Sequence, residues 1–428
     1  MPEVSFTNLV VVAAIAVGAP MLVGIFPRIR VPAVVLEIIA GIVVGPSGLG
    51  WVEIDEPIEI LALMGLAFLL FLAGLEIDAT RLRGHLLRLA GFGFLLTVVL
   101  GVGTGAALDA GGFVESPLLV GIALMATSLG LVVPVLKDAG QAETPLGQLV
   151  IASSSVADFG AVVLLTLFFS GEDSGAGAKL VLLGGFGLLV VAAALGLSRL
   201  GRSMRLEGVL VRLQDTTAEI RIRIAVLILI AFVALAEQLG IETILGAFLA
   251  GAILNMVDRD AMSTHPHFRI KLEAIGYGFL IPVFFVTSGL RFDLQALVDS
   301  PSAIARVPLF LLALLVVRAL PAALYRSTIE GRGAVAAGLL QATSLPFLVT
   351  AAAIGLELGE LTPETGAALV SAGLLSVIVF PIVSLALLRT GMPAADEPVA
   401  APRAPTLTPT EAAAPLVSQR HSGGRSDG

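Results

Sequence analysis

The chain has 428 residues, of which 57% are hydrophobic and 14% are charged, with a formal net charge of -8 and a mean hydropathy of +1.00. An average soluble domain carries roughly 25% charged residues, and a soluble fold of this length cannot bury so much apolar surface. The composition therefore excludes a soluble protein, and the absence of cysteine excludes disulfide frameworks and thiolate metal sites.

Long apolar runs predict an all-α membrane protein of about thirteen transmembrane helices, because roughly 20 apolar residues cross the hydrocarbon core as a helix. In chain order we expect spans at residues 9–26, 31–49, 58–75, 86–108, 117–136, 146–169, 178–197, 222–239, 244–257, 272–290, 304–325, 333–354 and 365–388. These spans form one transmembrane domain, residues 1–391. Residues 392–428 are rich in Ala, Pro, Thr, Ser and Gly, a composition that predicts a disordered tail.

The basic residues alternate with the predicted spans. Of the 25 Lys and Arg, 21 lie in every second connection or in the tail, and the opposite connections hold only Lys179, Arg291 and Arg306. Because basic loops face the cytoplasm, we expect an inner (plasma) membrane protein with its N-terminus outside and its C-terminus and tail in the cytoplasm.

Short sequences recur between the two halves of the chain. FLAGLEID at residues 71–78 resembles VTSGLRFD at 286–293, an offset of 215, and ATSL at 126–129 recurs at 342–345, an offset of 216. A weaker similarity relates LGAFLAG, ending at Gly251, to IAGIVVG, ending at Gly45.

The matched spans are an odd number of spans apart, so the copies run in opposite directions. We expect inverted-topology repeats at about 5–170 and 220–390, joined by a linking helix at about 178–197. Chance similarity between apolar strings is the alternative.

Both copies of ATSL lie in mid-span and precede a proline, Pro134 in span five and Pro346 in span twelve. Proline removes a helix donor, and hydroxyl side chains supply oxygens, so these spans are candidates for two discontinuous helices. Close packing through small residues with a tolerated kink is the other interpretation. The hydroxyl-bearing residues at these positions are Thr127, Ser128, Thr343 and Ser344.

Asp158 and Arg318 are charged residues that lie well inside predicted spans. Asp158 is in the middle of span six, where a carboxylate is costly enough to indicate a functional site, and Ser154 lies one turn earlier on the same helix face. Arg318 either extends to the membrane surface or points inward and neutralises a carboxylate or free helix-break carbonyls. For Asp158 the alternative is a purely structural role, in which the buried carboxylate is hydrogen-bonded to neighbouring hydroxyls. Glu37 and Glu237 are further proton-site candidates, although a Glu near a helix end commonly faces water.

The chain resembles the monovalent cation:proton antiporter-2 family, which includes bacterial sodium/proton and potassium/proton exchangers. The similarity covers nearly all of residues 5–390 and rests on the motifs at 31–37, 45–50, 70–78, 126–128, 245–251, 281–285 and 289–290. The resemblance implies thirteen helices, a homodimer, and two broken helices, spans five and twelve, that cross beside an ion-binding carboxylate. It makes Asp158 that carboxylate and Arg318 the basic residue that relatives have as Lys or Arg.

The chain departs from the family pattern at two places. Relatives often have Asp-Asp where this chain has Ala157-Asp158, and Gly-Glu-Phe where it has Leu345-Pro346-Phe347. The first departure leaves a single carboxylate that can bind a cation or a proton. The second means that the resemblance does not define the surroundings of the crossing in span twelve. Many relatives also carry a nucleotide-binding domain, which we do not expect here.

The sequence predicts a secondary active antiporter that exchanges Na⁺ or K⁺ for H⁺ by alternating access around Asp158. The expected ion ligands are Asp158, Ser154, Thr127 and Ser128, and a single carboxylate predicts electroneutral exchange. We expect no cofactor, no nucleic-acid partner and no enzymatic activity. A cation-coupled symporter of an organic solute and a membrane sensor without transport are the alternatives.

Overall fold

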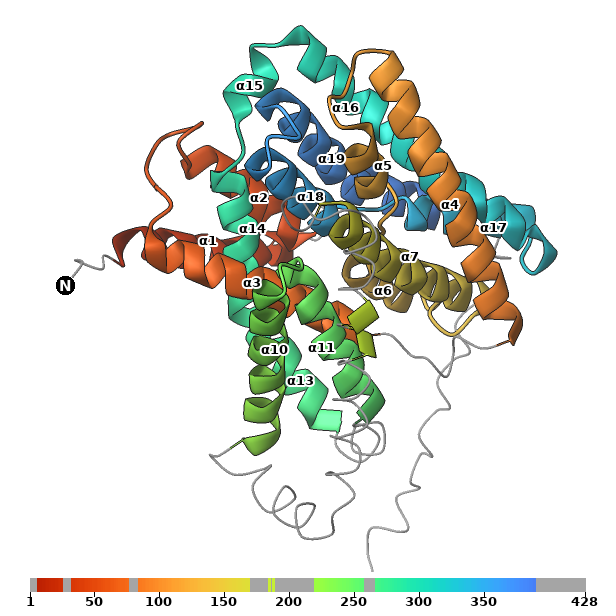
Figure 1. The fold of residues 1–428 in the computed structure, drawn as a ribbon, viewed down its shortest axis with the longest axis horizontal. Helices are drawn as coiled ribbons and strands as arrows, with labels where there is room; N and C mark the ends of the chain where they lie inside the picture. The colour runs from red at the N-terminus through yellow and green to blue at the C-terminus, as the bar shows by residue number, and fades with distance from the viewer. Residues whose placement is uncertain are drawn as a thin grey trace, which may run out of the picture. The chain divides into compact units, whose positions relative to one another are not determined.

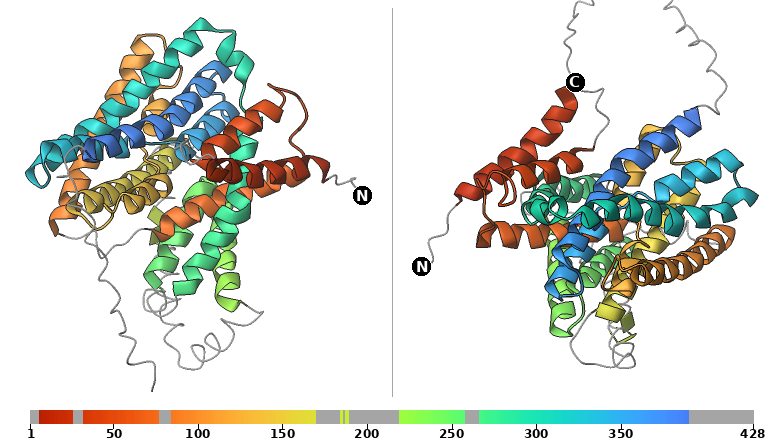
Figure 2. Two further views of the ribbon diagram at one scale, coloured as in Figure 1. Left: turned by 180° about the vertical axis from the view of Figure 1, so that it is seen from behind. Right: turned by 90° about the horizontal axis from the view of Figure 1, so that it is seen from above.

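The computed structural model describes residues 6–25, 32–76, 84–169, 184–185, 187–188, 219–257 and 266–389 (Figures 1 and 2). Within these ranges the regular structure is entirely helical, and eight helices are long and apolar enough to cross a membrane. The elements are, in chain order, α1 (Thr7–Ile25), α2 (Ala33–Val44), α3 (Glu56–Leu75), α4 (Gly84–Ala110), α5 (Pro117–Ala123), α6 (Leu129–Asp138), α7 (Pro145–Phe169), α10 (Ile220–Gln238), α11 (Thr243–Val257), α13 (Pro266–Ile275), the π-helix η1 (Gly276–Leu280), α14 (Ile281–Leu290), α15 (Leu294–Val298), α16 (Pro301–Leu314), the π-helix η2 (Leu315–Ala319), the 3-10 helix η3 (Leu320–Ser327), α17 (Gly331–Gln341), α18 (Pro346–Glu357) and α19 (Pro363–Arg389).

Every predicted span except the seventh coincides with one helix or with successive helices. The predicted linking helix at 178–197 lies almost wholly outside the described residues, as does the predicted tail at 392–428, so the count of thirteen stays a prediction. Spans ten and eleven each contain a π-helical turn, at η1 and η2 respectively. The second of these turns contains Arg318.

The helices pack in two groups. α1, α2, α3, α10, α11, α13, η1 and α14 contact mainly one another and are called the scaffold bundle below (Figures 1 and 2). The helices α4 to α7 and α15 to α19, with η2 and η3, likewise contact mainly one another and are called the crossed-helix bundle. Contacts between the groups are sparse and include those of α7 with α11.

Glycines bring the scaffold helices into backbone contact. A Cβ added to Gly289 of α14 would collide with the carbonyl oxygen of Ile38 in α2, and one added to Gly74 of α3 would collide with that of Phe248 in α11. Gly74 and Gly289 are the equivalent glycines of the matched motifs. Each repeat therefore packs its third helix against the second helix of the other repeat.

The same contacts correct the weaker sequence match. It aligned Gly251 with Gly45, but the glycine of α2 whose added Cβ would collide with α14 backbone in the reciprocal way is Gly41. The matched string contains both Gly41 of α2 and Gly45, the residue that follows the helix. Helix packing selects the glycine that faces the neighbouring backbone, and a string of apolar letters does not show that face.

Ion pairs join α3 to the α13–α14 segment at both ends. Arg291 Nη2 lies 3.0 Å from Glu59 Oε1, and Arg269 Nη2 lies 3.3 Å from Glu76 Oε1. The two helical segments are therefore antiparallel within the scaffold bundle.

Both ATSL segments interrupt their helices. α5 ends at Ala123 and α6 begins at Leu129, while α17 ends at Gln341 and α18 begins at Pro346. Pro346 occupies the first turn of α18, where its missing N–H is not needed. Pro134, in contrast, lies inside α6. The fifth span is thus broken without a proline, because its free N–H groups find tertiary partners.

Candidate functional site

The two helix breaks contact each other directly. The backbone N–H of Ser128 donates to the carbonyl oxygen of Thr343 (2.8 Å), and the Thr127 hydroxyl donates to the carbonyl oxygen of Gln341 (2.7 Å). All four residues are buried. These bonds satisfy backbone groups that the interrupted helices leave free, which is a strict requirement inside a membrane. The predicted crossing of two discontinuous helices is confirmed.

Asp158 lies beside this crossing. Its Oδ1 accepts a hydrogen bond at 2.9 Å from the backbone N–H of Thr127, which lies in the break between α5 and α6, whereas Asp158 is in α7. The carboxylate is part-buried and lies next to the N-terminus of α6, where helix dipoles favour negative charge. Asp158 is thus held at the point where an ion can reach the freed backbone and hydroxyl oxygens.

Arg318 points inward, so the alternative of a side chain extending to the membrane surface is wrong. It is only 2% exposed. Its Nε donates to the Thr127 hydroxyl (2.9 Å) and to the Gln341 carbonyl (3.3 Å), Nη2 also contacts that hydroxyl, and Nη1 lies 3.3 Å from Thr97 Oγ1. Thr127 therefore joins the two charged residues: its backbone N–H binds Asp158 and its hydroxyl binds Arg318.

The structure places the other predicted site residues differently. Ser154 is fully buried, and its Oγ has no hydrogen-bond partner among the described residues; the same holds for Ser344 Oγ. The backbone of Ser344 pairs with the Ser376 hydroxyl, whereas the Thr343 hydroxyl donates to the carbonyl oxygen of Leu339 in the last turn of α17 (3.3 Å). Ser154 therefore keeps a free oxygen one turn from Asp158, while Thr343 contributes through its carbonyl.

Asp158 borders a cavity of about 70 Å³ between the two bundles. Thr127 and Ser128 line it from the crossed-helix bundle, and Glu76 and Tyr277 line it from the scaffold bundle. The last two residues were not predicted as site residues. The signal available in the sequence was Glu76 itself, a carboxylate directly after a long apolar run.

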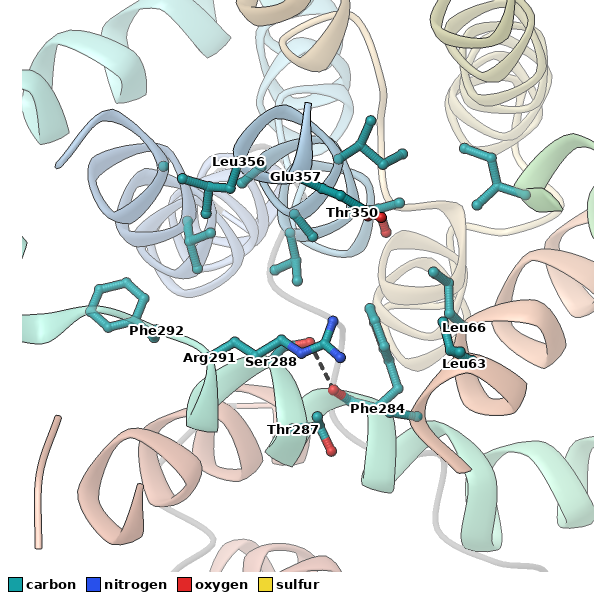
Figure 3. A pocket seen from close by; sticks show the side chains of 18 of the residues that line it. Leu63, Leu66, Phe284, Thr287, Ser288, Arg291, Phe292, Thr350, Leu356 and Glu357 are labelled. Carbon is teal, nitrogen blue, oxygen red and sulfur yellow. Dashed lines mark hydrogen bonds between the residues drawn. The ribbon is translucent and has the colours of Figure 1, made fainter. Parts of the chain in front are cut away.

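A second, larger cavity of about 390 Å³ lies farther along the same interface. Along α3, residues 62–66 line the larger cavity and residues 69–76 line the smaller one. Figure 3 shows side chains of α3, α14 and α18 around the larger cavity, with Arg291 extending into it and Ser288 Oγ donating to the carbonyl oxygen of Phe284 (2.7 Å). Asp158 lines the smaller cavity and is not among the residues of the larger one.

An all-α membrane protein with inverted contacts, two crossing helix breaks and a carboxylate at the crossing has the architecture of a secondary transporter. The comparison with protein families agrees. The sequence pattern described as "Sodium/hydrogen exchanger, transmembrane" matches residues 12–389. The chain belongs to this family, whose members are transporters of monovalent cations and protons and are not enzymes.

Individual relatives carry similar descriptions. The chain is 32% identical over 403 residues to the putative Na⁺/H⁺ antiporter YjbQ of Bacillus subtilis. The aligned region covers 89% of this chain and 63% of that protein. It is 28% identical over 370 residues to the probable Na⁺/H⁺ antiporter 3 of Methanocaldococcus jannaschii, covering 83% of this chain and 90% of that one.

The fold has a close counterpart among solved structures. The sodium proton antiporter MjNhaP1 of Methanocaldococcus jannaschii superposes with a TM-score of 0.65 over 89% of this chain and 98% of that chain, at 19% identity. At this identity the likeness shows the fold, and it confirms the predicted fold class.

Proposed function

We propose that this chain exchanges Na⁺ for H⁺ across the plasma membrane, with Asp158 as the site for which the two ions compete. The observation that carries the proposal is the Asp158 carboxylate, held by Thr127 at the crossing of two broken helices and bordering a cavity between two bundles. Family membership and the descriptions of both relatives support it. K⁺ requires the same oxygen chemistry and is the second ion to test.

Alternating access follows from the energetics of the buried carboxylate. A bare Asp158 is costly to carry through an apolar barrier, so the crossed-helix bundle moves against the scaffold bundle only when a cation or a proton neutralises it. The two successive cavities along the bundle interface support this motion, since each gives one side of the barrier its own approach. The cation ligands are Asp158, the hydroxyls of Thr127, Ser128 and Ser154, and carbonyls at the breaks.

The exchange is electroneutral in this proposal. Ala157 is buried next to Asp158 and has no charge to load, so the crossed-helix bundle carries either one cation or one proton at this position. Arg318 makes the same hydrogen bonds in both half-cycles and holds the crossing together. A flux that responds to membrane potential would contradict this stoichiometry.

The arrangement in the membrane belongs to the same proposal. The alternation of basic loops supports an N-terminus outside and a C-terminus in the cytoplasm. Residues 1–391 then form the exchanger domain, with repeats at about 5–170 and 220–390 around the linking helix at 178–197, and residues 392–428 form the tail. The family resemblance implies a homodimer.

The decisive experiment measures salt-induced dequenching of a pH dye in proteoliposomes. Na⁺, K⁺, Li⁺ and choline are compared for the wild type, Asp158→Asn and the control Asp109→Asn, which alters an exposed carboxyl at the end of α4. We expect cation-selective dequenching that only Asp158→Asn abolishes. A folded wild type without response would favour the symporter or the sensor. Full activity of Asp158→Asn would place the exchange site elsewhere.

A further inference from the structure

The cavity beside Asp158 has two walls of different chemistry. The crossed-helix bundle contributes the oxygens of Thr127, Ser128 and Asp158. The lining from the scaffold bundle is apolar apart from Glu76 and Tyr277. Glu76 and Tyr277 are therefore the polar side chains that the scaffold offers to an ion in this cavity.

One carboxylate oxygen of Glu76 has no hydrogen-bond partner in the part of the chain that the structure describes. Its Oε1 pairs with Arg269 Nη2 (3.3 Å), but the same guanidinium also holds Glu273 Oε1 through Nε (2.7 Å), so one positive charge serves two carboxylates. The other oxygen, Oε2, is buried and has no hydrogen-bond partner among the described residues. Burying a carboxylate oxygen without a partner is unfavourable, and a bound cation would offset that cost.

Tyr277 brings a second oxygen to the same place. Its hydroxyl lies 3.2 Å from the position that a Cβ on Gly130 would occupy, so it reaches across to the first turn of α6. This turn directly follows the break formed by Thr127 and Ser128. Oxygens from a carboxylate and a phenol thus face the crossing from the scaffold side, and hard monovalent cations prefer such ligands.

The internal repeat identifies the residue of the larger cavity that is equivalent to Glu76. The residue equivalent to Glu76 at the offset of 215 is Arg291, which lines the larger cavity. Arg291 is paired with Glu59, and carboxylates such as Glu357 also line that cavity. The group at the position equivalent to Glu76 is nevertheless a guanidinium, which is not a cation ligand. The two cavities therefore carry groups of opposite charge at repeat-related positions.

We propose that Glu76 and Tyr277 form a vestibule site for the exchanged cation, and that it contributes to cation affinity from one side of the membrane only. The inference rests on the exchange function proposed for Asp158. Glu76 belongs to the scaffold bundle, so it does not accompany Asp158 when the crossed-helix bundle moves. A cation entering from the smaller cavity meets Glu76 first, whereas one entering from the larger cavity does not.

The test measures the apparent KM for Na⁺ from each side separately, in right-side-out and inside-out membrane vesicles. For Glu76→Gln we expect a rise of about tenfold on one side and no change on the other, because one charged ligand is lost in one state. Tyr277→Phe should raise the KM on the same side by about two- to threefold, since a neutral oxygen binds more weakly. Glu273→Gln is the matched control, because it removes a carboxylate from the same Arg269 without lining the cavity.

Each outcome bears on one proposal. A KM for Glu76→Gln that is unchanged on both sides, or equally raised on both, overturns the vestibule site. An equal one-sided effect of Glu273→Gln also overturns it, because local charge would then explain the result without ligation. Retained exchange in Asp158→Asn, or a wild type without exchange, instead refutes the proposed function. Na⁺-dependent melting of each purified variant shows whether it is folded and binds the ion.

Discussion

Thr127 connects the carboxylate of the site to its guanidinium through two different groups. Its backbone N–H binds Asp158, and its hydroxyl donates to Gln341 and accepts from Arg318. A substitution that removes only the hydroxyl therefore separates these two functions. Any residue except proline keeps the backbone N–H that donates to Asp158.

For Thr127→Val we expect the maximal exchange rate to fall roughly tenfold, because loss of one or two buried hydrogen bonds costs about 1–2 kcal/mol at the crossing. The measurement is Na⁺-driven dequenching in proteoliposomes. Thr166→Val is the matched control, since Thr166 is buried in α7 and its hydroxyl has no partner among the described residues. Equal losses in both variants would show that the effect is one of general packing.

Arg318 is expected to be needed for exchange more than for folding. Arg318→Met keeps much of the side-chain volume but removes the donors to the Gln341 carbonyl and the positive charge near Asp158. The Thr127 hydroxyl still donates to that carbonyl, so the free energy of unfolding should fall by only about 1–3 kcal/mol, which lowers the melting temperature by a few degrees. Exchange should fall at least about tenfold.

The control for this charge change is Arg332→Met, at an exposed position in α17. It should leave both the melting temperature and the exchange rate close to those of the wild type. An active Arg318→Met protein would mean that the crossing needs no positive charge.

At the scale of the elements, sequence patterns located nearly all the helices but not their internal breaks in detail. Apolar runs show where a helix crosses the membrane, because length and hydropathy decide that. The break in span five depends on the Thr343 carbonyl and on Asp158, which lie far away in sequence. The ATSL motif indicates where this break lies, but no local signal shows how its free backbone groups are satisfied, and Pro134 lies several residues beyond it.

Glycine contacts within the scaffold give the element-scale prediction. Gly74→Val should lower the stability of the detergent-solubilised protein by about 1–3 kcal/mol, because the added side chain collides with the Phe248 carbonyl of α11. Gly103→Val is the control, since a Cβ there meets no atom within 4 Å while the cost of a β-branched residue in a helix is the same. Thermal melting followed by size-exclusion chromatography measures both variants.

For the whole molecule, relative motion of the bundles is the property to test. The chain has no cysteine, so introduced thiols are the only ones present. Phe159 of α7 and Phe248 of α11 belong to different bundles and stack with ring centroids 5.8 Å apart. A short reducible cross-linker between Phe159→Cys and Phe248→Cys should stop exchange without preventing Na⁺-dependent stabilisation, and reduction should restore it.

The matched pair for this experiment is Asn8→Cys with Asp55→Cys. The two native side chains are hydrogen-bonded (3.2 Å) within the scaffold bundle, so cross-linking them should leave exchange intact. Undiminished exchange with the inter-bundle cross-link in place would show that the two bundles do not move against each other.

The sequence by itself indicated that the chain lies in a membrane, where most of its spans lie, which family it belongs to and which charged residues are candidates for the site. Each of these depends on composition, local periodicity or motifs that can be read from a linear string. Only the tertiary structure decided that Arg318 points inward, that Thr127 links it to Asp158, and that Glu76 and Tyr277 border the same cavity. These contacts are between residues far apart in the sequence. They depend on which face of each helix packs against its neighbour, and the sequence alone does not show that face.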